Sequence, residues 1–272
     1  MAVILSGDQI AKTVLGALAK NIAGKKPLLA VIQVGKNPVS EKYVGEKEKI
    51  AIVLGAGFKK YDFAEDIPQE DLEKEIAAIG KDPAVSGMIV QLPLPRHIRA
   101  QKALDLIPEE KDADILSSSL FGKFALGECS MLPPTVEAIA LLLEKAGVHL
   151  RGATVAVVGA GRLVGLPLIF WLIRQGATVF VAHKDTKDLA SCTLSADVVI
   201  SGTGKAGLIT GGMIKAGAVV IDAGTSVEDG QTKGDVDFAS VSEKAGFITP
   251  VPGGVGPLTV ACLFKNLFSL HE

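Results

Sequence analysis

The chain alternates strand-length apolar runs with helix-length stretches of mixed polarity. In its first part, LLAVIQV at 28–34, FKKYDF, and GMIVQL at 87–92 are separated by segments of helical character. Strands separated by helices of this length predict βαβ units and therefore a parallel sheet. The sequence thus predicts an α/β fold. The first of these helices is expected to follow Pro38, to be capped by Ser40 and to end at Gly55 and Gly57.

A second α/β series runs through TVAVV, TVFVAH, DVVIS, AVVIDAG and GFITPV. Between the two series, a Ser- and Gly-containing link, SSSLFGKFALGE, precedes a long helix, TVEAIALLLEKAG, and the link is interpreted as a domain hinge. We therefore expect an N-terminal α/β domain at 1–118 and a second α/β domain at 119–257. The apolar helix within 258–272 is expected to pack back on the first domain.

Composition and charge narrow the class of partner. With 48% hydrophobic residues among 272 and a net charge of −2, the chain can form two cores, but it offers no basic field for nucleic acid or a membrane. Its 3 cysteines and 4 histidines are scattered, so we expect no disulfide framework and no metal. The apolar run at 163–173 is too short to span a bilayer, and Asp8 interrupts any signal segment. These features predict a cytoplasmic protein with a small-molecule partner.

A glycine-rich turn follows TVAVV directly and precedes a helix. Gly159, Gly161 and Gly165 stand where a Rossmann phosphate turn is expected, although the spacing G-x-G-x-x-x-G is one residue longer than the standard fingerprint. Glycine lets the backbone approach a pyrophosphate, whose charge then lies at a helix N-terminus. The turn predicts a Rossmann-type dinucleotide-binding domain.

The identity of the dinucleotide depends on the end of the next strand. NAD sites usually place an acidic side chain there, on the ribose 2′-hydroxyl. Here the strand ends in His183, Lys184 and Asp185. Lys184, together with Arg162, can pair with a 2′-phosphate, which favours NADP, while Asp185 leaves NAD open.

One helix and two strand ends carry candidate proton-transfer groups. Tyr43 and Lys47 are four residues apart and so share one helix face. An aromatic ring beside an amine can stack on a flat heterocycle and present a proton-transfer group to its edge. Gln91 ends an apolar strand at the edge where ligands bind, and Asp112 or Asp114 can accept paired hydrogen bonds from an aminopyrimidinone.

The segment TPVPGGVGPLT at 249–259 combines three prolines, which fix φ, with three glycines, which lack the Cβ that would keep a ligand off the backbone. Such a segment suits the approach of a flat ligand. The alternative interpretation is a proline-rich connection into the last helix.

These motifs together resemble the methylenetetrahydrofolate dehydrogenase/cyclohydrolase family, whose members are often bifunctional. VGKNPVSEKYVGEK, GMIVQLPLP, KDAD, GDVDF and TPVPGGVGPLT resemble its signatures in order, across nearly the whole chain. The resemblance implies a folate substrate in a cleft between two domains, NADP on the C-terminal domain, and a homodimer. It implies that Lys47 is the catalytic lysine, with Tyr43, Gln91 and Asp114 as stacking ring, lysine partner and pterin-binding carboxylate. It further implies that Pro252, Gly253 and Gly254 line the folate pocket, that Gly159, Ala160 and Gly161 hold the cofactor phosphates, and that Thr225 lies near the nicotinamide.

The implied chemistry is hydride transfer from 5,10-methylenetetrahydrofolate, followed by attack of water on the methenyl cation to give 10-formyltetrahydrofolate. Because a cation forms beside Lys47, burial and the cationic product are expected to favour its neutral amine, which can then act as a base. Two alternatives remain: a dehydrogenase without the cyclohydrolase step, and a non-catalytic dinucleotide-sensing module.

The chain departs from the family pattern at several places. Along the expected hinge, Ile115 stands where the family often has glycine, and Leu120 where it often has asparagine. Pro134, Val136 and Ala138 stand where cysteine, proline and glycine are frequent. In the cofactor turn, Ala160 and Gly161 replace a frequent arginine and serine, and that arginine is associated with the 2′-phosphate. The choice of NADP over NAD therefore depends on Lys184.

Overall fold

The computed structural model describes residues 1–21, 26–228 and 230–271, and the chain divides into two compact units. Unit 1 comprises Met1–Lys12 and Thr135–Thr259, while unit 2 comprises Thr13–Pro134 and Val260–Glu272. Each unit thus combines two separate stretches of the chain. This division differs from the boundary expected after residue 118, because the first twelve residues join the second α/β series and the stretch up to Pro134 stays with the first.

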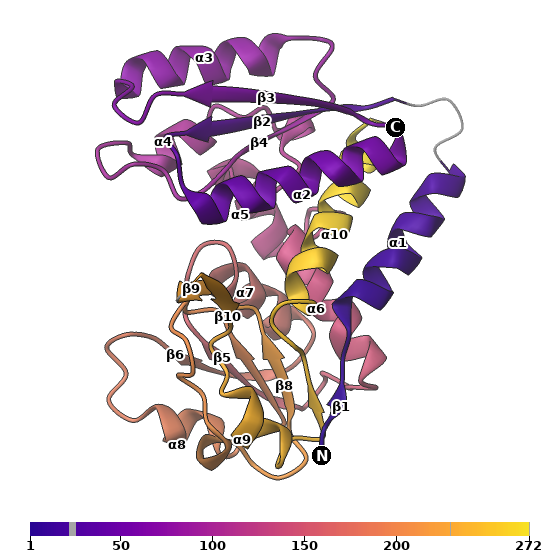
Figure 1. The fold of residues 1–272 in the computed structure, drawn as a ribbon, viewed down its shortest axis with the longest axis vertical. Helices are drawn as coiled ribbons and strands as arrows, with labels where there is room; N and C mark the ends of the chain where they lie inside the picture. Colours follow the sequence, from indigo (N-terminus) through magenta and orange to yellow (C-terminus); the bar gives the residue numbers. More distant parts are fainter. Residues whose placement is uncertain (22–25, 229, 272) are drawn as a thin grey trace. The chain divides into compact units, whose positions relative to one another are not determined.

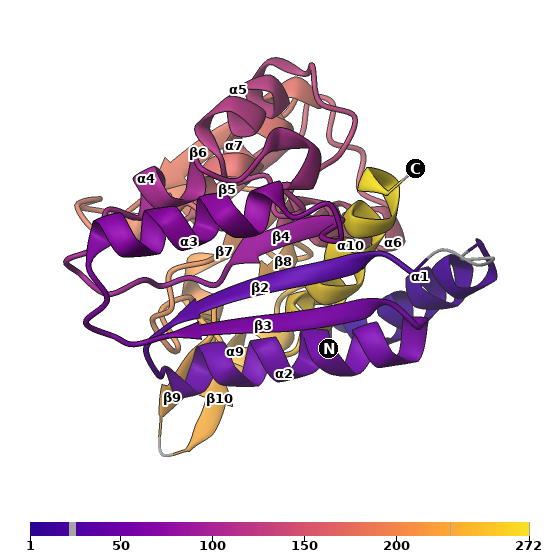
Figure 2. The same ribbon diagram turned by 90° about the horizontal axis from the view of Figure 1, so that it is seen from above.

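Unit 2 is built on a three-stranded parallel sheet in the order β3-β2-β4, visible side by side in Figure 2. The strands are β2 (Leu28–Val34), β3 (Gly57–Phe63) and β4 (Gly87–Val90). Helices α2 (Pro38–Leu54) and α3 (Gln69–Lys81) lie on opposite faces of this sheet (Figure 1). The βαβ organisation predicted from the apolar runs is confirmed.

The central strand β2 is buried on both faces, as an interior parallel strand should be. Ala30 and Ile32 belong to the core shared with α3, while Leu29 and Val31 belong to the core on the opposite face. That second core contains α2 and the last helix, α10 (Val255–Leu270). The α10 residues in it are Val260, Leu263, Phe264, Leu267 and Phe268.

The link expected between the two series is in fact largely helical. Helix α5 (Ser118–Leu126) forms because Leu120 and Phe124, four residues apart, bury one side of it, with exposed fractions of 7% and 0%. Gly127 ends the helix with a φ of +88°. The stretch interpreted as a domain hinge is therefore largely helical and lies within unit 2, and Leu120 is a core residue.

Unit 1 contains a six-stranded parallel sheet in the order β1-β11-β8-β7-β5-β6. The strands are β1 (Val3–Ile4), β5 (Thr154–Val158), β6 (Thr178–Ala182), β7 (Val198–Ser201), β8 (Val219–Asp222) and β11 (Phe247–Ile248). The chain steps from β5 outward to β6 and then returns to β7 on the other side of β5. The carboxyl ends of β5 and β7 therefore form the topological switch point, where ligands bind in such folds. The Rossmann-type architecture is confirmed.

Short helices and a hairpin complete unit 1 (Figure 1). They are α6 (Pro134–Lys145), α7 (Gly165–Arg174), α8 (Leu189–Thr193), η2 (Gly211–Met213), β9 (Ser226–Glu228), β10 (Gln231–Lys233) and α9 (Phe238–Ser242). Two departures from the family pattern, Val136 and Ala138, are fully buried in α6, and Pro134 is its first residue. Within the described residues, no helix is both long and apolar enough to cross a membrane.

Candidate active site

Helix α2 carries two of the predicted site residues, and its start differs from the expectation. The helix begins at Pro38, and the Ser40 backbone N–H donates to Asn37 Oδ1 at 3.0 Å, so Asn37 provides the side-chain cap. Ser40 lies in the first turn, where its buried Oγ donates to the Leu92 carbonyl at 3.4 Å. The prediction of Ser40 as the cap is wrong by one helical turn, while Gly55, with a φ of +67°, follows the helix end as expected.

The side chains of Lys47 and Gln91 meet directly. Lys47 Nζ donates to Gln91 Oε1 at 2.8 Å, and Gln91 Nε2 donates to the Leu92 carbonyl at 2.9 Å. Since the amide NH₂ is held by its own neighbour, the amide oxygen must face the lysine. Gln91 follows β4, and its backbone N–H pairs with the Ile32 carbonyl at 2.8 Å, so the rigid sheet sets its position.

The Tyr43 ring lies on the same side of α2 as the amine of Lys47. Lys47 Nζ is 6.0 Å from the Tyr43 ring centroid, at the outer limit of a cation–π contact. Both side chains are partly buried. The helical spacing of four residues therefore places ring and amine together, as predicted.

Asp114 lies in a loop that runs alongside β4, and it interacts with Lys47. Asp112 forms an isolated parallel bridge with Met88, so the chain runs beside β4 toward its carboxyl end. The fully buried Asp112 carboxylate accepts the backbone N–H groups of Leu116, at 3.1 Å, and Ser117, at 2.9 Å. Asp112 thus shapes the loop, and Asp114 interacts electrostatically with Lys47.

Burial and mutual charge shift the pKa values of this pair. Burial lowers the pKa of Lys47 from its ordinary value, and the charge of Asp114 opposes the shift. Burial raises the pKa of Asp114 to about 6; the charge of Lys47 opposes the shift and that of Asp112 adds to it. The direction for Lys47 agrees with the prediction of an amine pushed toward its neutral form.

Ile115 adopts a backbone conformation that β-branched residues rarely take. Its φ is +57°, and it is the one non-glycine residue with positive φ in the described part of the chain. Its side chain is completely buried. Ile115 therefore adopts the left-handed conformation that glycine adopts easily, and its apolar side chain is packed in the core beside the turn.

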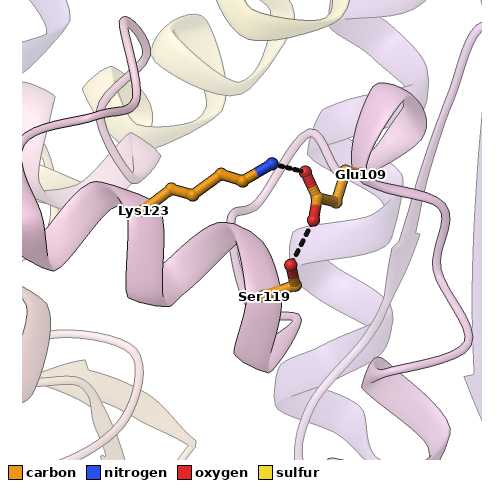
Figure 3. Close-up of polar contacts among 3 residues, drawn as sticks. All are labelled: Glu109, Ser119 and Lys123. Atoms are coloured by element: carbon orange, nitrogen blue, oxygen red, sulfur yellow. Dashed lines mark hydrogen bonds and ion pairs between the residues drawn. The ribbon is translucent and has the colours of Figure 1, made fainter.

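Polar contacts brace the loop that carries Asp112 and Asp114 on both sides. In Figure 3, Glu109 in the short helix η1 (Glu109–Lys111) contacts Ser119 and Lys123 of α5. Lys111 Nζ donates to the carbonyls of Gly80, at 2.8 Å, and Asp82, at 2.7 Å. The loop is thus tied to α5 and to the end of α3.

Gln33 is a polar residue near this group that the sequence reasoning missed. It is 3% exposed, its Nε2 donates to the Gly35 carbonyl at 3.3 Å, and its Oε1 is buried with no hydrogen-bond partner. It follows Ile32, which pairs with Val90, so it lies level with Gln91. The signal was present, because LLAVIQV and GMIVQL each place a glutamine near the carboxyl end of an apolar strand.

The glycines of the nucleotide turn have different structural roles. Gly159 has a φ of +97°, and a Cβ on Gly165 would lie 1.7 Å from the Gly159 carbonyl oxygen, so neither tolerates a side chain. A Cβ on Gly161 would meet nothing within 4 Å. Ala160 and Gly161 are exposed beside the switch point, and this open, bare backbone before α7 fits a dinucleotide phosphate.

The other predicted cofactor residues also lie in unit 1. Lys184 is exposed in the turn after β6, where the His183 N–H donates to Thr186 Oγ1 at 2.9 Å and the Asp185 N–H donates to His183 Nδ1 at 3.3 Å. Thr225 lies in the turn between β8 and β9. In the described part of the chain, no three His, Cys, Asp or Glu residues gather closely enough to hold a metal ion.

The proline- and glycine-rich motif lies against the start of α1 (Gly7–Asn21), a helix that the sequence reasoning did not predict. The N–H groups of Gly7 and Asp8 donate to the Gly253 carbonyl at 2.9 Å and 3.2 Å. A Cβ on Gly7 would lie 1.7 Å from the Gly254 carbonyl oxygen. The second half of the motif is the first turn of α10, so only Thr249–Gly254 is irregular.

Comparison with known proteins matches both parts of the chain to domains of the same family. Residues 5–114 match the tetrahydrofolate dehydrogenase/cyclohydrolase catalytic domain, and residues 133–272 match the NAD(P)-binding domain of the same family. A "bifunctional protein FolD" of Geobacillus thermodenitrificans is 42% identical over 97% of this chain and 95% of its own length. Another from Bordetella avium is 43% identical over 94% of this chain and 90% of its own.

Solved structures show the same similarity. The Trypanosoma brucei methylenetetrahydrofolate dehydrogenase-cyclohydrolase, complexed with NADP and an inhibitor, superposes with a TM-score of 0.95 at 37% identity, over 99% of this chain and 97% of that one. The bifunctional enzyme from Campylobacter jejuni superposes with a TM-score of 0.94 at 37% identity, over 99% and 98% of the two chains.

Proposed function

This chain belongs to the tetrahydrofolate dehydrogenase/cyclohydrolase family, and we propose that it oxidises 5,10-methylenetetrahydrofolate with NADP and hydrolyses the product to 10-formyltetrahydrofolate. The observation that carries the proposal is the contact of Lys47 Nζ with Gln91 Oε1 at 2.8 Å, beside Tyr43 and Asp114, within the region that matches the family's catalytic domain. A non-catalytic dinucleotide sensor would have no need of this assembled group.

In the first reaction, we propose that unit 2 holds the folate and unit 1 the dinucleotide. NADP, when bound, accepts the hydride that leaves the methylene carbon between N5 and N10 of the folate. The substrate is left as a methenyl cation. Asp114 would accept hydrogen bonds from the aminopyrimidinone edge, and the Tyr43 ring would stack near the pterin. Pro252, Gly253 and Gly254 stay a prediction as folate-binding residues.

In the second reaction, water adds to the methenyl carbon and loses one proton. The hydroxyl of this adduct then gives up its proton as the carbonyl forms, the carbon–nitrogen bond to N5 breaks, and N5 takes up a proton, which leaves the formyl group on N10. We propose that Lys47 takes up the proton of the attacking water. Its lowered pKa supports this role, because a neutral amine can accept a proton and does not repel the cationic substrate. Gln91, held by the Leu92 carbonyl, would keep the amine in place.

The cofactor is proposed to lie across the switch point of unit 1. The backbone at Gly159, Ala160 and Gly161 would hold the phosphates at the start of α7, and Thr225 would lie toward the nicotinamide. Lys184, exposed after β6, is the cation nearest in sequence to the expected ribose position and is proposed to favour NADP. NAD remains the alternative.

The Lys47 assignment is tested by Lys47→Met. We expect loss of methenyltetrahydrofolate hydrolysis with nearly unchanged NADP binding, since the two groups belong to different units. The matched control is Lys49→Met, one half-turn away, whose amine pairs with exposed Glu46 and should be dispensable. Hydrolysis at the wild-type rate in Lys47→Met would remove the base role.

The folate-binding role is tested separately with Asp114→Ala. We expect a raised KM for methylenetetrahydrofolate and an unchanged KM for NADP. Following nicotinamide reduction and then decay of the methenyl product also distinguishes a bifunctional enzyme from a dehydrogenase that lacks the second step. An unaltered folate KM would contradict the assignment of Asp114.

We further propose that the protein acts as a homodimer in the cytoplasm. Leu166, Phe170 and Ile173 are exposed along α7, next to the edge strand β6, and Leu163 is exposed just before the helix. A second copy that covers this apolar face would remove it from water. Light scattering on the purified protein and on Ile173→Lys tests this: a monomeric wild type would refute the dimer.

A further inference from the structure

Two carboxylates are buried in unit 1, away from the folate-binding group. Asp222, the last residue of β8, is 3% exposed, and Asp235, after the β9–β10 hairpin, is 0% exposed. Burying a carboxylate is costly unless its oxygens accept hydrogen bonds. The partners of each oxygen therefore indicate what the two residues hold in place.

Both oxygens of Asp222 accept backbone N–H groups. Oδ1 accepts from Gly224 at 2.9 Å and from Asp235 at 3.1 Å, and Oδ2 accepts from Val236 at 2.9 Å. Burial raises the pKa of Asp222 to about 6, against the effect of these hydrogen bonds. Asp222 thus fixes its own turn and the segment that carries Asp235.

Asp235 uses only one of its oxygens. Oδ2 accepts the Ser201 hydroxyl at 2.7 Å and the Thr203 backbone N–H at 2.6 Å, whereas Oδ1 is buried with no hydrogen-bond partner. The two carboxylates are therefore not equivalent. Two acceptor oxygens are required at position 222, and one suffices at position 235.

Two glycines let the backbone close over these carboxylates. A Cβ on Gly224 would lie 2.0 Å from Asp235 Oδ1, and a Cβ on Gly234 would lie 2.1 Å from Asp222 Oδ2. Such close approach requires glycine at both positions. The carboxylates and the chain around them therefore form one rigid assembly.

The segment that Asp235 holds lies at the cofactor end of the sheet. Ser201 is the last residue of β7, and a Cβ on Gly159 would lie 2.7 Å from the carbonyl oxygen of the next residue, Gly202. The loop 201–203 therefore lies against the first glycine of the nucleotide turn. Any shift of this loop would move the surface on which the dinucleotide rests.

We propose that Asp222 and Asp235 are positioning residues for the dinucleotide site: Asp235 holds the loop 201–203 against Gly159 through one oxygen, and Asp222 holds the segment that bears Asp235. This inference rests on the cofactor site proposed above. Neither residue contacts the reacting atoms in this scheme, so their effect should appear in cofactor affinity before it appears in the folate reactions.

The geometry predicts opposite outcomes for the same chemical change at the two positions. In Asp235→Asn, the amide oxygen can take the position of Oδ2 and accept the same two hydrogen bonds. The NH₂ group then takes the position of Oδ1, to which no N–H donates, so NADP affinity should stay within about threefold of wild type. In Asp222→Asn, the NH₂ must face a backbone N–H in either orientation, and NADP affinity should fall about tenfold or more. Asp235→Leu, which removes both acceptors, should behave like Asp222→Asn.

Isothermal titration with NADP measures these affinities. Circular dichroism during thermal unfolding reports whether unit 1, which contains both carboxylates, is folded in each variant, and the rate of methenyltetrahydrofolate hydrolysis without cofactor reports whether the Lys47–Gln91 group in unit 2 is intact. Ser201→Ala is a milder variant, which removes one donor to Asp235 and should weaken NADP binding about threefold with full hydrolysis. Equal effects of the two asparagine substitutions, or loss of hydrolysis in step with NADP affinity, would overturn the inference. Failure of the wild type to bind NADP would instead refute the cofactor site.

Discussion

The left-handed backbone at Ile115 gives a prediction with a definite sign. An L-residue in this conformation is destabilised by about 1–2 kcal/mol relative to glycine. Replacing Ile115 by alanine removes buried side-chain atoms but keeps most of this strain, whereas glycine removes both. Ile76, in the middle of α3, is equally buried but has a helical backbone, so glycine there should cost about 1 kcal/mol more than alanine.

The informative quantity is the difference in unfolding free energy between the glycine and alanine variants at each site. Loss of the last buried methyl contributes equally at both sites and cancels. Changing alanine to glycine should therefore be more favourable at position 115 than at position 76 by about 2–3 kcal/mol. Urea unfolding followed by circular dichroism measures this, and both positions lie in unit 2, so one transition reports both. If glycine is worse than alanine by the same amount at the two sites, the strain at Ile115 does not exist.

Three further predictions concern the two sites. The pKa of Asp114 in the folded protein is about 6, above the ordinary 3.8, so the stability of the wild type should fall as pH rises from about 4 to 6. In urea titrations, Asp114→Asn should therefore be more stable than the wild type at pH 8, by up to about 3 kcal/mol, and as stable as the wild type at pH 4. Lys184→Ala should lower the NADP-to-NAD preference in kcat/KM, and an unchanged ratio would remove the case for NADP. Gly165→Ala should lower NADP affinity about tenfold or more, because its Cβ would lie 1.7 Å from the Gly159 carbonyl oxygen; NADP binding at wild-type affinity would contradict the turn geometry.

The parts of the fold that follow from local periodicity were predictable. The central strands of the two parallel sheets correspond to apolar runs, whereas the edge strand β3 has the mixed sequence GFKKYDF. The four-residue spacing of Tyr43 and Lys47 placed them on one helix face. Gln91 was also predictable, because the carboxyl end of a parallel strand is a ligand-binding edge. The nucleotide turn followed from its strand, glycines and helix in sequence.

Features that depend on distant contacts were not predictable in this way. Strand β1 joins the second α/β series only because β11 offers a free edge more than 200 residues away. Asparagine and serine can both cap a helix, so the sequence does not show which of them does so. Asn37 is the cap because the helix begins at Pro38. The burial of Asp222 and Asp235 was hidden, because carboxylates in a sequence are ordinarily read as surface residues.

The interleaving of the two units along the chain has a consequence for synthesis on the ribosome. The first α/β series is complete at Pro134, yet its core still lacks Phe264, Leu267 and Phe268, which arrive at the very end. The first twelve residues, in turn, must wait for β11 at 247–248 before they can pair. Neither unit can therefore finish folding on its own as it emerges, and both should reach their final packing in a late step, once the last helix is released.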